Sequence, residues 1–258
     1  QVEVSHLYQT VDQSLWVVTN KGLHQLANEK WQLTLAGQSV SFIQETKGGE
    51  MWVGTNQGLY RLKLGEWVQE MSAAANCFAE LADGSLLVGG NDGLRIKPTV
   101  EEALVVLTHL QGNFISRLFL SSDGLMWCCS TAGIFSYDGV TWKQRDGHRF
   151  QSPDVRKWLW TSNIFEDGKG RVWFAFPFVS LRVFSDGKLE RSVGSPWRSA
   201  IIETSDGRMW TAGLGDPNIY DGNDNKEWIA LSGYGDPGQD TWSYAVHADN
   251  DGSIWVGG

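Results

Sequence analysis

The sequence predicts an all-β fold: a β-propeller of seven blades, each a four-stranded antiparallel sheet, with the last blade incomplete. Two observations carry this prediction. A large hydrophobic residue, usually Trp, recurs at intervals close to the roughly 40 to 45 residues of a four-stranded blade. The short apolar stretches around it are separated by Gly turns, which join strands into hairpins.

The recurring hydrophobic residues, called anchors below, open the second strand of each repeat. Most follow Asp-Gly or a related pair, which supplies the positive φ of a tight hairpin turn. We expect each anchor side chain to fill the space between neighbouring blades, where truncating a core aromatic costs about 3–5 kcal/mol. The anchors are Trp16, Trp52, Leu87, Trp127, Trp173, Trp210 and Trp255.

The first strand of each repeat is predicted from a column of apolar residues that lie at one distance before the anchors. These are Leu7, Ile43, Phe78, Leu118, Ile164, Ile201 and Val246. Two positions earlier, and so on the same strand face, the residue is Ser or Asn in most copies. A polar position beside an apolar one indicates the end of the strand, near a loop or a central channel.

The third and fourth strands complete each unit. Gly followed by Leu or Ile begins the third strand, as in Gly58 and Leu59. A second Trp column marks the fourth, outer strand at Trp31, Trp67, Trp142 and Trp228. A four-stranded sheet buries its faces only against neighbours, so stacking around an axis is the favoured solution.

The repeats predict one propeller domain over residues 1–258. Its blades are 1–35, 36–72, 73–110, 111–145, 158–192, 197–230 and, in part, 242–258. A parallel solenoid is the competing architecture, but it would use shorter repeats without two hairpins in each unit. We expect the protein to continue beyond Gly258, or this last blade to be incomplete.

Composition narrows the classes of function. The formal net charge is −9 and no run of Lys or Arg forms a basic stripe, so a nucleic-acid partner is not expected. No apolar run approaches the ~18 residues of a membrane span, so this segment is not expected to insert into a membrane. Cys77, Cys128 and Cys129 have no zinc-type spacing and are interpreted as small core residues.

The residues around the second anchor resemble the two-component regulator propeller repeat. Residues 51–62 are the closest copy, reading Met-Trp-Val-Gly-Thr-Asn-Gln-Gly-Leu-Tyr-Arg-Leu. The resemblance is strong in repeats one to four, partial in five and six and truncated in seven. It implies a propeller from the periplasmic sensor region of a bacterial hybrid two-component system, linked to the sensing of glycans or other nutrients.

Departures from the repeat indicate where a ligand would bind, because loops on a rigid scaffold usually carry the binding groups. The longer connections lie in the second half of the chain and map to one face of the predicted ring. Aromatic, Arg and Asp side chains there could stack a sugar or clamp a peptide. This candidate patch comprises Arg156, Trp158, Trp160, Phe176, Trp197, Arg198, Asp216, Tyr234 and Trp242. The alternative is that these loops pack their own aromatics over the blade ends.

Other candidate sites are weaker. His6 and His247 lie on predicted inner strands and are interpreted as ordinary core or surface residues. Four carboxylates share one column, seven positions before the anchor: Glu45, Glu80, Glu166 and Glu203. A ring of carboxylates could bind a cation, but hydrogen-bonded strand ends are the favoured interpretation. No metal site, cofactor or catalytic residue is predicted.

The sequence therefore predicts a non-enzymatic, ligand-binding sensor propeller in the periplasm or outside the cell, with a small molecule, a carbohydrate or a protein as partner. Two alternatives stay open. One is a propeller lyase or hydrolase similar to streptogramin lyases, whose His and acidic centre we match here only at His148 and His247. The other is a scaffold that binds another protein through the same face.

Overall fold

The computed structural model describes residues 2–27, 29–99, 101–147, 163–176, 180–193, 198–213, 218–220, 229–230, 245–249 and 253–257. The chain divides into two compact units, residues 1–118 and residues 119–258. The sheets are numbered 1 to 7 in chain order.

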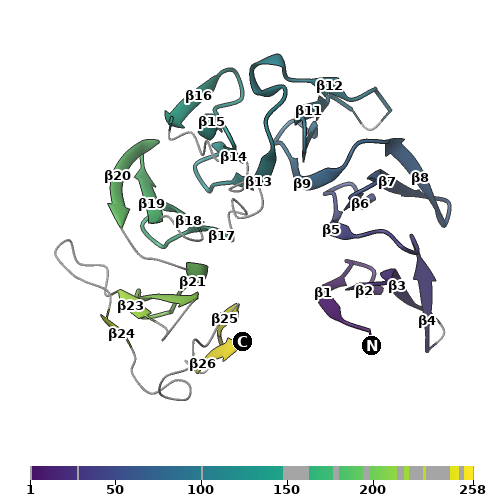
Figure 1. The fold of residues 1–258 in the computed structure, drawn as a ribbon, viewed down its shortest axis with the longest axis horizontal. Coiled ribbons are helices and arrows are strands. Elements are labelled where there is room, and N and C mark those ends of the chain that lie inside the picture. The colour runs from purple at the N-terminus through teal and green to yellow at the C-terminus, as the bar shows by residue number, and fades with distance from the viewer. Residues whose placement is uncertain are drawn as a thin grey trace. The chain divides into compact units, whose positions relative to one another are not determined.

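The first unit contains three antiparallel sheets, each with its strands in chain order (Figure 1). Sheet 1 is formed by β1 (Val4–Gln9), β2 (Leu15–Thr19), β3 (Gly22–Ala27) and β4 (Lys30–Thr34). Sheet 2 is formed by β5 (Val40–Glu45), β6 (Met51–Thr55), β7 (Gly58–Lys63) and β8 (Glu66–Met71). Sheet 3 is formed by β9 (Ala75–Glu80), β10 (Leu86–Gly90), β11 (Gly93–Lys97) and β12 (Val105–Val106). The 3₁₀ turn η1 (Thr108–Leu110) follows it.

The second unit repeats this arrangement. Sheet 4 starts with β13 (Ile115–Leu120), which crosses the boundary between the units, and continues with β14 (Met126–Ser130), β15 (Gly133–Tyr137) and β16 (Trp142–Asp146). Sheet 5 is formed by β17 (Asn163–Glu166), β18 (Val172–Phe176), β19 (Ser180–Ser185) and β20 (Lys188–Val193). Sheet 6 is formed by β21 (Arg198–Glu203), β22 (Met209–Gly213), β23 (Asn218–Tyr220) and β24 (Ile229–Ala230). Sheet 7 pairs β25 (Ala245–Ala248) with β26 (Ile254–Gly257).

The predicted all-β class is confirmed, with four-stranded antiparallel sheets and, among the described residues, a single short 3₁₀ turn as helix. The Gly turns act as the sequence indicates. At Gly133, φ is +121° and an added Cβ would lie 2.1 Å from the carbonyl oxygen of Asp146, so only glycine lets the third and fourth strands approach there. The seven-blade closure and the single domain stay predictions.

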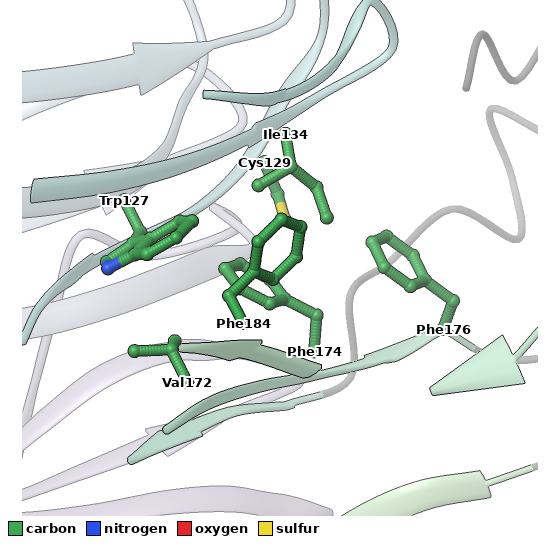
Figure 2. Close-up of a cluster of buried hydrophobic side chains, with 7 residues drawn as sticks. All are labelled: Trp127, Cys129, Ile134, Val172, Phe174, Phe176 and Phe184. Carbon is green, nitrogen blue, oxygen red and sulfur yellow. The ribbon is translucent and has the colours of Figure 1, made fainter. Parts of the chain in front are cut away.

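Anchor side chains fill the spaces between consecutive sheets. In the first unit, Trp16 packs against Met51 and Val53 of sheet 2, and Trp52 packs against Phe78 of sheet 3. The rings of Trp52 and Phe78 stack with their centroids 5.7 Å apart. In the second unit, Trp127 packs against Phe174 and Phe184 of sheet 5, in a cluster that also contains Val172 and Phe176 (Figure 2). This interlayer packing is what the anchor column predicted for these positions.

Trp255 differs from that expectation. Its side chain is 63% exposed, whereas Trp16, Trp52, Leu87, Trp127 and Trp173 are at most 2% exposed. Its sheet consists, among the described residues, of β25 and β26, and none of the described core clusters includes it. An indole is buried only when a second apolar layer covers it, and the described part of this sheet has none.

Sheet 1 presents one face without a described neighbour. Pairing places Leu7, Val17, His24 and Leu33 on one row of this face, and Gln9, Leu15, Leu26 and Trp31 on the next. Leu7 is 69% exposed, Trp31 49% and Leu33 48%. The equivalent residues of sheet 2, including Ile43, Met51, Val53, Leu62 and Trp67, pack against sheet 1. We call the uncovered surface the sheet 1 open face.

Candidate functional site

Most of the predicted patch lies outside the described residues. This holds for Arg156, Trp158, Trp160, Trp197, Asp216, Tyr234 and Trp242. Arg198 is the first residue of β21. That these residues together form a ligand-binding patch stays a prediction.

Phe176 is the one patch residue whose side chain is described, and it is buried. It ends β18, is 3% exposed and stacks on Phe174 with centroids 6.5 Å apart (Figure 2). It packs in the core between sheets 4 and 5, so its side chain is not part of an exposed surface. The sequence pattern does not predict this burial, because a Phe at the end of a strand fits the pattern equally well whether its side chain points outward or into the core.

The interrupted connections of the second unit leave the sheets at a common end. Because neighbouring strands alternate in direction, the second and the fourth strand of each four-stranded sheet end at the same edge of that sheet. The connections 147–162, 194–197 and 231–244 follow fourth strands, and 177–179 and 214–217 follow second strands. In the first unit the corresponding connection between β8 and β9 spans only 72–74. The two longest connections that follow a fourth strand, 147–162 and 231–244, belong to the second unit.

A charged pair lies at the end of β16, where the connection 147–162 begins. Asp146 accepts a hydrogen bond from Nε of Arg182 on β19, at 3.0 Å, and the two side chains are 17% and 11% exposed. Both residues make further interactions. This pair joins sheets 4 and 5.

The carboxylate column joins neighbouring sheets. Glu166 accepts hydrogen bonds from the backbone N–H and the hydroxyl of Ser122, at 2.7 and 2.6 Å. The other three repeat this pattern, each accepting a backbone N–H from the first hairpin of the preceding sheet: Glu45 from Val11, Glu80 from Lys47 and Glu203 from Gly168. Among the described residues no group of His, Cys, Asp and Glu is arranged to hold a metal ion. The favoured interpretation, hydrogen-bonded strand ends, matches this geometry.

Replacing Glu166 with Ala should lower the free energy of unfolding of the second unit by about 1–2 kcal/mol, because two hydrogen bonds to a charged acceptor are lost at a partly exposed site. Glu166→Gln keeps one acceptor oxygen and should lose about half as much. Urea titration followed by far-ultraviolet circular dichroism measures both. An Ala variant as stable as the wild type would show that these carboxylates do not hold the sheets together.

A second column of residues, each one position after the carboxylate column, accepts hydrogen bonds from anchor side chains. Ser121 accepts a hydrogen bond from the indole Nε1 of Trp127 at 3.1 Å, and Asp167 accepts one from Nε1 of Trp173 at 2.8 Å. Asp167 also accepts from Nε of Arg171 at 2.7 Å. Its side chain is fully buried. The sequence analysis did not single out this column, although its small polar residues follow the strand in most repeats.

A network of six charges joins sheets 2 and 3, with Arg61 and Lys63 on β7, Glu70 on β8 and Lys97 on β11. Glu70 lies 2.9 Å from Lys63, 3.2 Å from Lys97 and 3.5 Å from Arg61. Arg61 also pairs with Glu50 and Glu101, each at 3.1 Å. Burial alone would raise the pKa of Glu70, but the hydrogen bonds and charges of Lys63 and Lys97 outweigh it and lower that pKa. The charges balance within the network, which makes it a structural clamp.

The two histidines on predicted inner strands do not belong to a charge network of this kind. His6 on β1 and His247 on β25 are exposed. Within the described part of the chain, no helix is long and apolar enough to cross a membrane.

Comparison with known proteins gives the fold. No protein-family model matches the sequence, and no curated protein matches it. The extracellular domain of the hybrid two-component system BT4673 from B. thetaiotaomicron is similar, with a TM-score of 0.69 and 16% identity over 98% of this chain and 36% of that chain. The extracellular domain of BT3049 from the same organism has a TM-score of 0.52 and 16% identity, covering 98% of this chain and 44% of that one.

The likeness shows the fold. This chain spans about a third of the length of the BT4673 domain. A second kind of neighbour is virginiamycin B lyase from Staphylococcus aureus, with a TM-score of 0.64 and 12% identity over 98% of this chain and 91% of the lyase. The same architecture therefore occurs in sensor domains and in an enzyme, so the function has to be argued from the site.

Proposed function

We propose that this chain is a seven-bladed propeller with an incomplete last blade, carrying the two-component regulator propeller repeat. It acts as the ligand-binding part of a bacterial sensor in the periplasm or outside the cell. The observation that supports this most is the likeness to two extracellular sensor domains, which extends over 98% of the chain. The ligand is a glycan or another small molecule, and the chain itself is not an enzyme.

The place of binding in this proposal is the end of the second unit where the long connections leave the sheets. Their sequence is rich in Trp, Tyr, Arg and Asp, a composition suited to stacking a sugar ring and bonding its hydroxyls. Two described features border these connections in the sequence: Phe176, buried at the end of β18, and the Asp146–Arg182 pair at the end of β16. A protein partner on the same surface is the alternative occupant.

A ligand screen tests the proposal. The purified chain is titrated with a panel of oligosaccharides and with peptides, and binding is measured by calorimetry. We expect a saturable glycan ligand whose affinity falls at least ten-fold in Trp160→Ala, Trp197→Ala or Trp242→Ala, because stacking area is lost. Trp31→Ala, an exposed Trp in the first unit, is the matched control and should bind normally. If none of the three variants weakens any ligand found, the patch is structural.

The lyase alternative is favoured by one observation, the coverage of 91% of virginiamycin B lyase. Incubating the chain with virginiamycin B and following the intact compound by liquid chromatography separates the two functions. We expect no loss of the compound beyond the rate of a buffer blank. Turnover that survives repurification of the chain would replace the sensor proposal with an enzymatic one.

A further inference from the structure

Arg145 on the outer strand of sheet 4 occupies the same structural position as Glu70 in sheet 2. The register of β15 with β16 shifts between Ile134 and Phe135, so that Arg145 is the extra residue of a β-bulge. The register of β7 with β8 shifts in the same way at Leu59 and Tyr60, which makes Glu70 the extra residue. Bulges re-aim a side chain and often accompany binding sites. The two positions can therefore be compared directly.

The surroundings of the two bulged residues differ in charge. Arg61, the cross-strand partner of the Trp52 anchor, is replaced in sheet 4 by Ser136, the partner of Trp127. Lys97, which pairs with the residue before the anchor in sheet 3, is replaced in sheet 5 by Phe184. Glu70 lies within ion-pair distance of three cations, whereas Arg145 donates a hydrogen bond to the neutral hydroxyl of Ser136. At this bulge a guanidinium thus replaces the carboxylate on which the network of sheets 2 and 3 is centred.

The guanidinium of Arg145 is held in place without an acid. Its Nε donates a 2.8 Å hydrogen bond to Oγ of Ser136, a residue that is 1% exposed. It lies against Gly187, where an added Cβ would come within 2.9 Å of its Cζ. Nearby acids are engaged elsewhere: Asp138 pairs with Lys143 at 3.1 Å and Asp146 with Arg182 at 3.0 Å. No described carboxylate lies within ion-pair distance of Arg145.

A half-buried guanidinium with its Nε fixed presents its two Nη groups as a planar fork, which matches a two-oxygen anion. We propose that Arg145, held by Ser136 against Gly187, is an oxyanion-binding site that takes a carboxylate, sulfate or phosphate group of a ligand. The turn of Asp186 and Gly187 that flanks it joins β19 to β20, at the opposite end of sheet 5 from the segment 177–179. The proposal rests on Arg145, Ser136 and Gly187 and does not depend on the proposed function.

Titration of the intact chain with acetate, phosphate and sulfate, at constant ionic strength set with sodium chloride, tests this site. The arginine Nε–H signals of ¹⁵N-arginine-labelled protein report on each guanidinium, and the signal missing in Arg145→Gln assigns Arg145. We expect a saturable shift of that signal with at least one of the three anions. A response to acetate alone indicates a carboxylate ligand, and a response to phosphate or sulfate indicates a tetrahedral one.

Variants separate a fixed site from general charge attraction. Calorimetry with the anion that binds should show at least a ten-fold weaker affinity for Arg145→Gln and for Arg145→Lys, because Lys cannot form the planar pair. Lys143→Gln, which removes an exposed cation two residues away, should bind within two-fold of the wild type. Circular dichroism of each variant checks that the fold is kept. Shifts that do not saturate with any anion, or that respond equally to Lys143→Gln, would overturn the proposal.

Discussion

Replacing Asp167 with Ala is expected to lower the free energy of unfolding of the second unit by about 3–5 kcal/mol, because it removes one partner of a buried ion pair. The change would leave Arg171 without this carboxylate partner. The Arg171 side chain is 14% exposed, and its Cζ lies 5.2 Å from the centre of the Trp173 ring. It would also remove the carboxylate that accepts hydrogen bonds from the buried Nε1–H of Trp173 and from the backbone N–H groups of Lys169 and Arg171. Urea titration followed by circular dichroism measures the change.

Ser121→Ala is the matched control for Asp167→Ala. Ser121 holds the same position in sheet 4 and also accepts from its anchor indole, but it carries no charge and no arginine depends on it. Its loss should cost only about 1 kcal/mol. Equal costs for the two variants would show that the ion pair contributes nothing beyond the hydrogen bond to the indole.

Truncating Trp52 to Ala should destabilise the first unit by about 3–5 kcal/mol, since it empties a fully buried position between two sheets. The indole also has Arg61 over its ring, with Cζ 5.6 Å from the centroid, so the clamp of charges would loosen with it. The measurement is again the denaturant midpoint and slope of the first unit's transition.

Trp31→Ala removes the same ring from the sheet 1 open face and is the comparison for Trp52→Ala. Because Trp31 is 49% exposed, the loss should be below about 1 kcal/mol. A cost close to that of Trp52→Ala would mean that another surface covers the sheet 1 open face in solution, and the description of that face as uncovered would be wrong.

The sequence predicted the strands and the interlayer anchors because both depend on local pattern. Trp52 and Trp127 follow a tight turn and alternate with small residues, which is sufficient to place them on a buried strand face. The candidate patch could not be reached in the same way. Phe176 shows why: the pattern locates it at a strand end, but only the packing of Phe174 and Phe184 decides that it points inward.

The polar contacts between sheets also escaped the sequence. The carboxylate column was visible as a column, but its acceptor role depends on the N–H groups of a turn that lies about one repeat earlier in the chain. Arg145 gave no signal either, since an arginine on an outer strand is ordinary until the missing counter-charge beside it is seen.

The interlayer clusters have a consequence for how the protein forms. Among the described residues, each of the four clusters joins only sheets that follow one another in the chain: 1 with 2, 2 with 3, 4 with 5 and 5 with 6. Chain segments that meet early need little loop closure, so ordering can begin at several places during synthesis and spread to the next neighbour. A destabilising substitution in one of these clusters should likewise affect mainly the two sheets that it joins. The gain or loss of a whole repeat should be easier to tolerate than an insertion of the same length inside a strand.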